Sequence, residues 1–297
     1  MSEIGRLLTA MVTPFASDGS VDYEAAKRLA LALLDSGSDG LVVGGTTGES
    51  PTLTHDEKLR LFAEVKGAVG DRGAVVAGTG SYSTAASVEL TREAERTGVD
   101  GALLVTPYYH KPTQEGLARH FQAIASETKL PCILYNVPGR TCVNMEAETT
   151  IRLSAVENII GVKEASGDLK QIARIIEGTE GFRVWSGADE HNLPILEVGG
   201  YGAVSVISHL VGRQIRTMID DVLAGRSEDA SAIHERLLPL VRGLFLVTSP
   251  IPLKHALGQL GFPAGGLRLP LCEPDAATGE RIMAEVRRHQ IDLAVSV

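Results

Sequence analysis

A lysine lies in a strand-like apolar run, where its amine could attack a carbonyl group. Residues 159–165 are Ile-Ile-Gly-Val-Lys-Glu-Ala, so Lys163 follows four uncharged residues. Burial disfavours the ammonium form of lysine, and the neutral amine can form a Schiff base with a carbonyl carbon. Alternatively, Lys163 ends a strand and extends its amine into water, which is the favoured interpretation for a lysine taken alone.

Two further groups of residues would support Schiff-base chemistry. The phenol of Tyr135, at the end of the preceding strand-like run, could carry protons to and from an iminium. Residues 45–48, Gly-Thr-Thr-Gly, offer hydroxyls and backbone N–H groups that could hold the carboxylate of a 2-oxo acid. A turn that merely satisfies its own backbone is the alternative for this loop.

Other polar residues follow neighbouring strand-like runs. Tyr108 and Tyr109 would by themselves be rim or interface aromatics, and Arg140, after Pro138 and Gly139, would by itself be a solvated turn residue. Their joint occurrence at separate strand ends, together with a strand lysine, favours one shared site.

Eight short apolar runs separate the candidate helices. The runs cover residues 7–12, 41–43, 74–77, 102–105, 132–134, 159–162, 182–185 and 203–207. Apolar residues at near-3.6 spacing between them, as in residues 25–34 and 117–125, indicate amphipathic helices. Continuous apolar strands with helical crossovers predict an α/β fold, a closed (β/α)8 TIM barrel. An open doubly wound sheet is the alternative, but the chain has neither common glycine-rich phosphate loop.

The pattern changes after residue 225. We expect a catalytic barrel domain over residues 1–225 and a C-terminal helical region over residues 226–297, with helices at 230–246, 252–260 and 276–288. Because the carboxyl ends of barrel strands meet at one mouth, the candidate residues above should converge there. Thr54 and Glu57 have the spacing of a capping box that begins a helix.

Composition excludes several classes of function. Lys and Arg number 28 against 37 Asp and Glu, a net charge of −9 that disfavours nucleic acid and anionic membranes as partners. No apolar run is long enough to cross a bilayer and no secretory signal pattern is visible, so we expect a cytoplasmic protein. Cys132, Cys142 and Cys272 have neither metal-ligand nor disulfide spacing and are interpreted as reduced packing residues.

Five motifs spread over nearly the whole chain form a specific set. They are residues 8–15 (LTAMVTPF), 45–53 (GTTGESPTL), 105–109 (VTPYY), 135–141 (YNVPGRT) and 161–169 (GVKEASGDL). This set resembles the dihydrodipicolinate synthase and N-acetylneuraminate lyase family of Schiff-base barrel enzymes. The resemblance implies a class I lyase that binds pyruvate to Lys163 as an imine and condenses it with aspartate 4-semialdehyde. The product would be 4-hydroxy-tetrahydrodipicolinate, a precursor of diaminopimelate and lysine.

The resemblance also implies the catalytic residues and the assembly. Tyr135, Thr46 and Tyr109 would relay protons at the imine of Lys163, with Tyr109 reaching in from a neighbouring subunit. A homotetramer, a dimer of dimers, would then be part of catalysis. No metal or organic cofactor is expected, because the imine itself is the electron sink.

Substrate-binding residues follow from the same resemblance. Thr46 and Thr47 would hold the pyruvate carboxylate, and Arg140 would receive the carboxylate of the semialdehyde. The backbone at Val204 would face the imine, and Gly187 would border the substrate. Arg140 is the main discriminator, because family members that cleave sugar acids generally lack the Pro-Gly-Arg-Thr wording.

The chain departs from the usual family pattern at two positions near the site. His110 stands where Asn commonly follows the tyrosine pair, and Ala188 stands where Asp is usual. A pyruvate-dependent aldolase or dehydratase acting on a 2-oxo-3-deoxy sugar acid is therefore the alternative function. A non-catalytic barrel that serves as a scaffold or sensor is a third.

A lysine feedback site is also implied by the resemblance. It maps to Ser50, His55, Lys58, Tyr82, Ala86 and Tyr108. Tyr82 replaces a usual Asn and Ala86 a usual Glu, and an alanine cannot pair with an ammonium group. We therefore expect free lysine to inhibit weakly or not at all.

Overall fold

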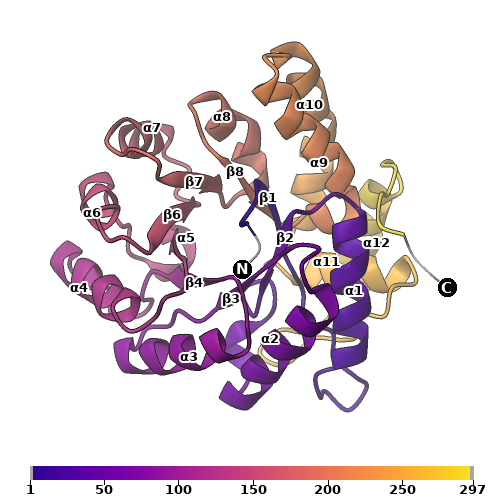
Figure 1. Cartoon of the computed structure of the whole chain (residues 1–297). Coiled ribbons are helices and arrows are strands. Elements are labelled where there is room, and N and C mark those ends of the chain that lie inside the picture. Colours follow the sequence, from indigo (N-terminus) through magenta and orange to yellow (C-terminus); the bar gives the residue numbers. More distant parts are fainter. Residues whose placement is uncertain (1–2, 295–297) are drawn as a thin grey trace.

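Eight parallel strands form a closed barrel in the computed structural model, which describes residues 3–294 (Figure 1). The strand order follows the sequence, and β1 closes the sheet against β8 with Leu8 opposite Val204. The strands are β1 (Leu7–Ala10), β2 (Gly40–Val43), β3 (Ala74–Gly78), β4 (Gly101–Val105), β5 (Cys132–Asn136), β6 (Ile159–Glu164), β7 (Arg183–Ser186) and β8 (Gly202–Ser205). The predicted TIM barrel is confirmed, but the runs at 7–12 and 203–207 continue beyond the observed strands.

Helices surround the barrel and follow the strands. They are α1 (Tyr23–Asp35), α2 (His55–Val69), α3 (Thr84–Arg96), α4 (Gln114–Ala125), α5 (Pro138–Thr141), α6 (Ala147–Leu153), α7 (Leu169–Glu177), α8 (Asn192–Glu197) and α9 (Ser208–Leu223), with short 3-10 turns η1 (Ser50–Thr52) and η2 (Asp189–His191). The capping box predicted for α2 is confirmed, since Thr54 Oγ1 accepts from Glu57 N–H and the Glu57 carboxylate accepts from Thr54 N–H.

Three more helices form the C-terminal region. They are α10 (Ser227–Leu244), α11 (Ile251–Gln259) and α12 (Ala276–Val286), each within three residues of its predicted bounds. In Figure 1 they gather on the side of the barrel that carries α9 and α1, and α10 packs along α9. A domain division between residues 225 and 226 stays a prediction.

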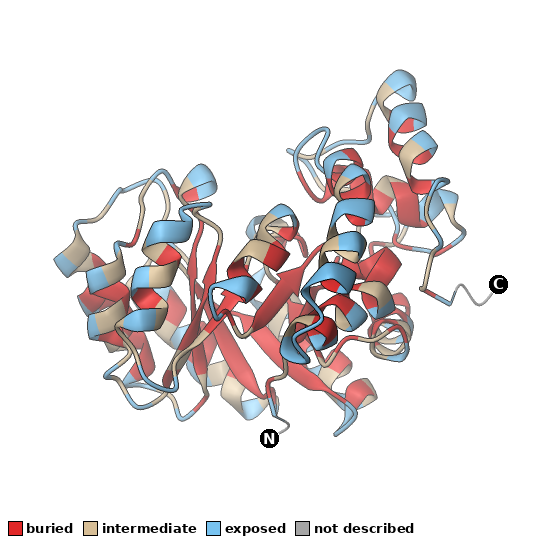
Figure 2. Ribbon diagram, turned by 90° about the horizontal axis from the view of Figure 1, so that it is seen from above, coloured by how far each residue is buried: buried red, intermediate tan, exposed pale blue. Residues whose placement is uncertain are grey.

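Two apolar layers stabilise the barrel, because strand side chains alternate between its inside and its outside. Inside lie residues such as Leu8, Val42, Ile133, Trp185 and Val204. The outward residues pack against the helices, and Figure 2 shows buried strands enclosed by helices that expose their outer faces.

The amino end of the barrel is closed by an aromatic and guanidinium stack. The ring of Tyr201 lies 5.1 Å from that of Trp185, and the guanidinium groups of Arg6 and Arg183 lie 4.4 and 4.8 Å from the Tyr201 ring centre. Trp185 Nε1 donates to the Gly5 carbonyl at 3.0 Å. Cation–π contacts therefore reinforce the packed floor below the strands.

The cysteines differ in environment. Cys132 is buried in β5, and burial raises the pKa of its thiol to about 12. Cys142 and Cys272 are exposed, so their interpretation as packing residues is wrong; both lie in loops with little apolar cover. No helix in the described range 3–294 is long and apolar enough to cross a membrane.

Candidate active site

Lys163 and Tyr135 lie side by side inside the barrel. The parallel register of β5 and β6 places Tyr135 opposite Lys163, and the Lys163 Nζ lies 4.2 Å from the centre of the Tyr135 ring. Both residues are 5% exposed. The alternative in which the lysine extends into bulk water is therefore excluded, because its side chain lies inside the barrel mouth.

The amine of Lys163 is available for chemistry. Within the described part of the chain its Nζ has no hydrogen-bond or ion-pair partner, while it borders a cavity of about 760 Å³. This differs from the other deeply buried lysine, Lys254, whose amine has three oxygen partners. A buried amine left unpaired at a cavity is suited to nucleophilic attack.

The cavity collects most of the predicted site residues from separate strand ends. Among its lining residues are Thr46, Thr47, Tyr135, Arg140, Lys163 and Gly187. A smaller neighbouring cavity of about 240 Å³ shares Thr46, Tyr135 and Arg140 with it and extends to Ser50 and Tyr108. The convergence expected at the carboxyl end of the barrel is thus observed.

The Thr46–Thr47 loop is fixed by its backbone conformation at both ends and by contacts with the segments after β1 and at the end of β3. Gly44 begins it at φ 66° and Glu49 ends it at φ 57°, both in the left-handed region. Thr13 Oγ1 donates to the Gly48 carbonyl at 2.7 Å. A side chain on Gly78, in the neighbouring strand, would collide with the Gly44 carbonyl, which explains why glycine occupies that position.

Arg140 projects from the short helix α5 that follows β5. Val137 precedes the helix and Pro138 occupies its first position, where a missing N–H costs no hydrogen bond. The Arg140 guanidinium donates at 3.4 Å to the carbonyl of Ser249, in the loop after α10. The C-terminal region therefore helps to hold this cation at the cavity.

Gly187 and Val204 have different relations to the cavity. A Cβ atom on Gly187 would lie 3.0 Å from Cγ and Cε of Lys163, so this glycine provides room for the lysine side chain. Val204 packs inside the barrel below the cavity and does not line it, whereas Val206, two residues further, does. The expected role of the Val204 backbone stays a prediction.

Tyr109 points away from the cavity of its own chain. It is 86% exposed, its φ is 73°, and its ring meets His110 edge-on at 5.6 Å. Within this chain it does not join the Tyr135 and Thr46 pair. Tyr108 instead lines the smaller cavity and meets Tyr82 edge-on at 5.3 Å.

The residues predicted for lysine feedback lie on η1, α2, the loop before α3, α3 and, for Tyr108, the loop after β4. Tyr82 is exposed and covers one side of Tyr108, while Ala86 is exposed on α3. Burial lowers the pKa of Lys58, and His55 pairs with Glu93. Glu93, two turns beyond Ala86, therefore already has a partner.

A polar network behind Lys163 was missed in the sequence analysis. Glu164 faces outward from β6, where it accepts from Ser166 Oγ at 2.6 Å and from the side chain of Asn136. Asn136 also donates at 2.8 Å to Asn144. Burial raises the pKa of Glu164 to about 7, although both hydrogen bonds oppose the shift. Strand alternation could have located it, because Glu164 directly follows an inward lysine.

Asp189 was also missed. Its carboxylate accepts from the N–H groups of Val206 and Ile207 at 2.8 and 3.1 Å and from the Asn192 amide at 3.0 Å. It therefore ties the loop after β7 to the end of β8 at the cavity wall. In residues 3–294 no group of three or more His, Cys, Asp or Glu side chains is placed to hold a metal ion.

Fold and site together define a barrel enzyme in which a buried lysine lies beside a tyrosine ring at the cavity. A model of the Dihydrodipicolinate synthetase family matches residues 3–289, and the chain belongs to this family. It is a lyase of that family and acts on small molecules.

Relatives agree over nearly the whole length. The chain is 59% identical to a 4-hydroxy-tetrahydrodipicolinate synthase from Dehalococcoides mccartyi, over 99% of this chain and 100% of that protein. The same function is given to a relative from Moorella thermoacetica, 56% identical over 95% of this chain and 97% of that one. Among solved structures, a dihydrodipicolinate synthase from Bacillus anthracis has a TM-score of 0.95 at 44% identity and covers 97% of this chain and 99% of its own.

Proposed function

We propose that the chain is a 4-hydroxy-tetrahydrodipicolinate synthase that captures pyruvate on Lys163 and condenses it with aspartate 4-semialdehyde. The observation that carries the proposal is the unpaired, buried amine of Lys163 beside the Tyr135 ring, at a cavity with two threonines and an arginine. Relatives that bear the synthase name at 56–59% identity support the choice of reaction.

Capture of pyruvate uses the amine as a nucleophile. Neutral Lys163 Nζ attacks C2 of pyruvate, a carbinolamine forms, and loss of one water gives the imine. Loss of a proton from C3 then gives an enamine. In this step Tyr135, with Thr46 and Tyr109 of a second copy, moves the proton.

Condensation then joins the two substrates. The enamine carbon attacks the aldehyde carbon of the semialdehyde and forms the C–C bond, while the relay protonates the new alkoxide. The amino group of the bound product attacks the imine carbon, which closes the six-membered ring and releases Lys163. The only other product is the water lost on imine formation, so no oxidant, metal or organic cofactor is required.

Two carboxylates need partners at the cavity. Thr46 and Thr47 bind that of pyruvate, because their loop offers hydroxyl and backbone donors next to Lys163. Arg140 binds that of the semialdehyde, since a guanidinium matches a carboxylate with two parallel hydrogen bonds. Gly187 borders the imine.

The working form is a cytoplasmic homotetramer, a dimer of dimers, without nucleic acid or membrane partners. The exposed Tyr109 supports an assembly in which a second copy completes the relay. One similar structure is described as the first monomeric dihydrodipicolinate synthase variant, which points to larger assemblies among its relatives.

Reductive trapping tests the central step. Pyruvate with borohydride should add one reduced pyruvyl group to Lys163, located by peptide mass spectrometry, and Lys163→Ala should abolish the adduct. Absence of the adduct in the wild-type chain would contradict the proposed function.

Arg140 tests the second substrate. Arg140→Ala should raise KM for aspartate semialdehyde by about tenfold or more while the pyruvate adduct still forms, because only the distal carboxylate loses its partner. The wild-type enzyme should be assayed against a panel of 2-oxo-3-deoxy sugar acids. Cleavage of one of them faster than condensation would favour the aldolase instead.

A further inference from the structure

The side chain of Glu49, at the end of the Thr46–Thr47 loop, turns away from the cavity into a buried ion pair. Its Oε1 accepts from Lys254 Nζ of α11 at 2.8 Å, and both side chains are 0% exposed. Its Oε2 accepts from the backbone N–H of Arg268 at 3.1 Å. The residue that ends this loop is therefore attached at both oxygens to the C-terminal region.

Lys254 is fully paired. Besides Glu49, its Nζ donates to the Thr13 carbonyl at 2.9 Å and to the Gly266 carbonyl at 2.6 Å. Its three donors thus have three acceptors, and the amine lies 4.2 Å from the centre of the Phe15 ring. A buried charge with every donor satisfied defines one geometry, because each displacement breaks a hydrogen bond that water cannot replace.

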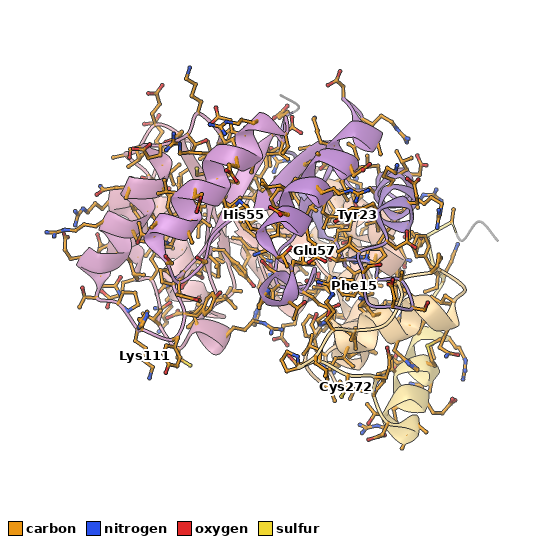
Figure 3. The ribbon with its side chains drawn as sticks, turned by 90° about the horizontal axis from the view of Figure 1, so that it is seen from below. Phe15, Tyr23, His55, Glu57, Lys111 and Cys272 are labelled. Atoms are coloured by element: carbon orange, nitrogen blue, oxygen red, sulfur yellow. The ribbon has the colours of Figure 1, made fainter. Side chains whose placement is uncertain are left out.

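A second cation, Arg268, lies next to the Glu49–Lys254 pair. The Arg268 guanidinium lies 4.4 Å from the centre of the Phe15 ring and donates to both carboxylate oxygens of Glu57 at 2.6 and 2.8 Å. It also donates to the Thr52 carbonyl at 2.9 Å. Figure 3 shows Phe15 and Glu57 on the side of the barrel that faces the C-terminal helices.

The backbone conformation of Glu49 links its side-chain contacts to the Thr46–Thr47 loop. Its φ of 57° is unfavourable for a residue other than glycine, so contacts made by its side chain must hold it there. Thr46 and Glu49 share a turn in which Glu49 N–H donates to the Thr46 carbonyl at 3.1 Å. A change at Glu49 therefore reaches the hydroxyls at the cavity.

We propose that Glu49 and Lys254 are positioning residues for pyruvate: their buried ion pair lets the C-terminal region hold the Thr46–Thr47 loop in the geometry that receives the pyruvate carboxylate. This inference rests on the proposed function, which assigns that carboxylate to Thr46 and Thr47. The pair touches no substrate, so it acts through the loop.

Two single variants test the role. Lys254→Met keeps the chain length but removes the charge, and Glu49→Gln keeps the shape but leaves Lys254 without its counter-ion. Each should raise KM for pyruvate, and the pyruvate concentration that half-saturates the borohydride adduct, by about tenfold. KM for aspartate semialdehyde should stay within about twofold of wild type. Arg140 is positioned by α5 and by its hydrogen bond to the Ser249 carbonyl, and not by the ion pair.

A matched control separates positioning from stability. Asp275→Ala removes the side chain that caps α12, where Asp275 accepts from Thr278 N–H at 2.7 Å, in the same C-terminal region. It should lower Tm and leave the pyruvate dependence of the adduct unchanged. If Lys254→Met does not fold, Glu49→Gln decides, because it preserves volume and one acceptor for Lys254.

The outcomes distinguish the two proposals. An absent adduct in the wild-type chain contradicts the proposed function. A wild-type adduct with the same pyruvate dependence in the folded variants shows that the ion pair only stabilises the fold, and overturns its positioning role. A rise confined to pyruvate supports that role.

Discussion

Lys163 and Tyr135 lie next to each other because β5 and β6 pair in register, although 28 positions separate the two residues in the chain. The Tyr135 ring lies against the amine, and Gly187, directly after β7, leaves space for the lysine side chain. We therefore expect the reactivity of Lys163 to depend on the space around its side chain as well as on the functional groups nearby.

Gly187→Ala tests the volume requirement. The added Cβ would lie 3.0 Å from two carbons of Lys163, so the lysine must shift. We expect the rate of borohydride-trapped adduct formation to fall by about tenfold or more. Gly67→Ala in α2 is the control, because nothing lies within 4 Å of its new Cβ. It should keep the wild-type adduct rate and gain roughly 0.5–1 kcal/mol of stability. An unchanged rate in Gly187→Ala would contradict the prediction.

Glu164→Gln tests the buried carboxyl behind Lys163. Burial raises the pKa of Glu164 from 4.5 to about 7, so the folded protein retains a proton that the unfolded chain releases. The contribution of protonated Glu164 to the free energy of unfolding is fully present below about pH 4.5. It falls by roughly 3 kcal/mol as the pH rises to about 7. Glutamine has no such titration, so the difference in Tm between variant and wild type should increase in favour of the variant across this range. If the Tm values of wild type and Glu164→Gln change with pH in parallel, the prediction is contradicted.

At the scale of elements, loops at the strand ends bring substrate groups and candidate regulatory groups close together. Ser50 and Tyr108 line the same small cavity as Thr46 and Tyr135, while Ala86 lies on the exposed face of α3. The helix that would bind the ammonium group of lysine thus lacks a carboxylate at the expected position.

Lysine sensitivity should be weak and should increase on restoring that carboxylate. At saturating substrates we expect no submillimolar inhibition constant for wild type, and an at least severalfold lower constant for Ala86→Glu, because a charge-assisted hydrogen bond is gained. A relative from Cyanidioschyzon merolae, 46% identical, has been solved with lysine bound and serves as a positive control for lysine binding. Submillimolar inhibition of wild type would refute the prediction.

The sequence predicted the elements better than the long-range contacts between them. Apolar periodicity located the strands, and strand ends located Lys163, Tyr135 and Thr46, because these signals are local. The Glu49–Lys254 pair spans 205 positions, and nothing local marks either residue as a partner of the other. Asp189 was missed for a similar reason, since its backbone partners, Val206 and Ile207, lie just beyond the end of the next strand, β8.

At the scale of the whole molecule, one chain by itself does not bring together the residues of the proposed proton relay, because Tyr109 is exposed. Tyr109 is directed outward with His110 beside it, although the proposed reaction needs its phenol at the imine. The C-terminal helices, by contrast, are integrated with the barrel through Arg140 and Lys254. A boundary after residue 225 would therefore cross contacts that shape the cavity.

Hybrid assemblies test whether Tyr109 acts between copies. Lys163→Ala and Tyr109→Phe should each be nearly inactive alone. Coexpressed, they should regain activity, because a wild-type Lys163 can receive Tyr109 from the other variant. Sequential purification on a different tag for each variant isolates the hybrids, and sedimentation should show tetramers. If hybrids are no more active than the Tyr109→Phe variant alone, the relay does not cross subunits.

The stack of Tyr201, Trp185 and two arginines closes the barrel at its amino end. In the proposed reaction, pyruvate, the expelled water and the semialdehyde would all enter or leave through the cavity at the opposite end. The order in which the substrates bind would then depend on how deep each one sits. The keto acid must be seated at the bottom before the aldehyde can occupy the entrance above it. An aldehyde that arrives first would obstruct the lysine, and excess semialdehyde should therefore inhibit the enzyme competitively with pyruvate.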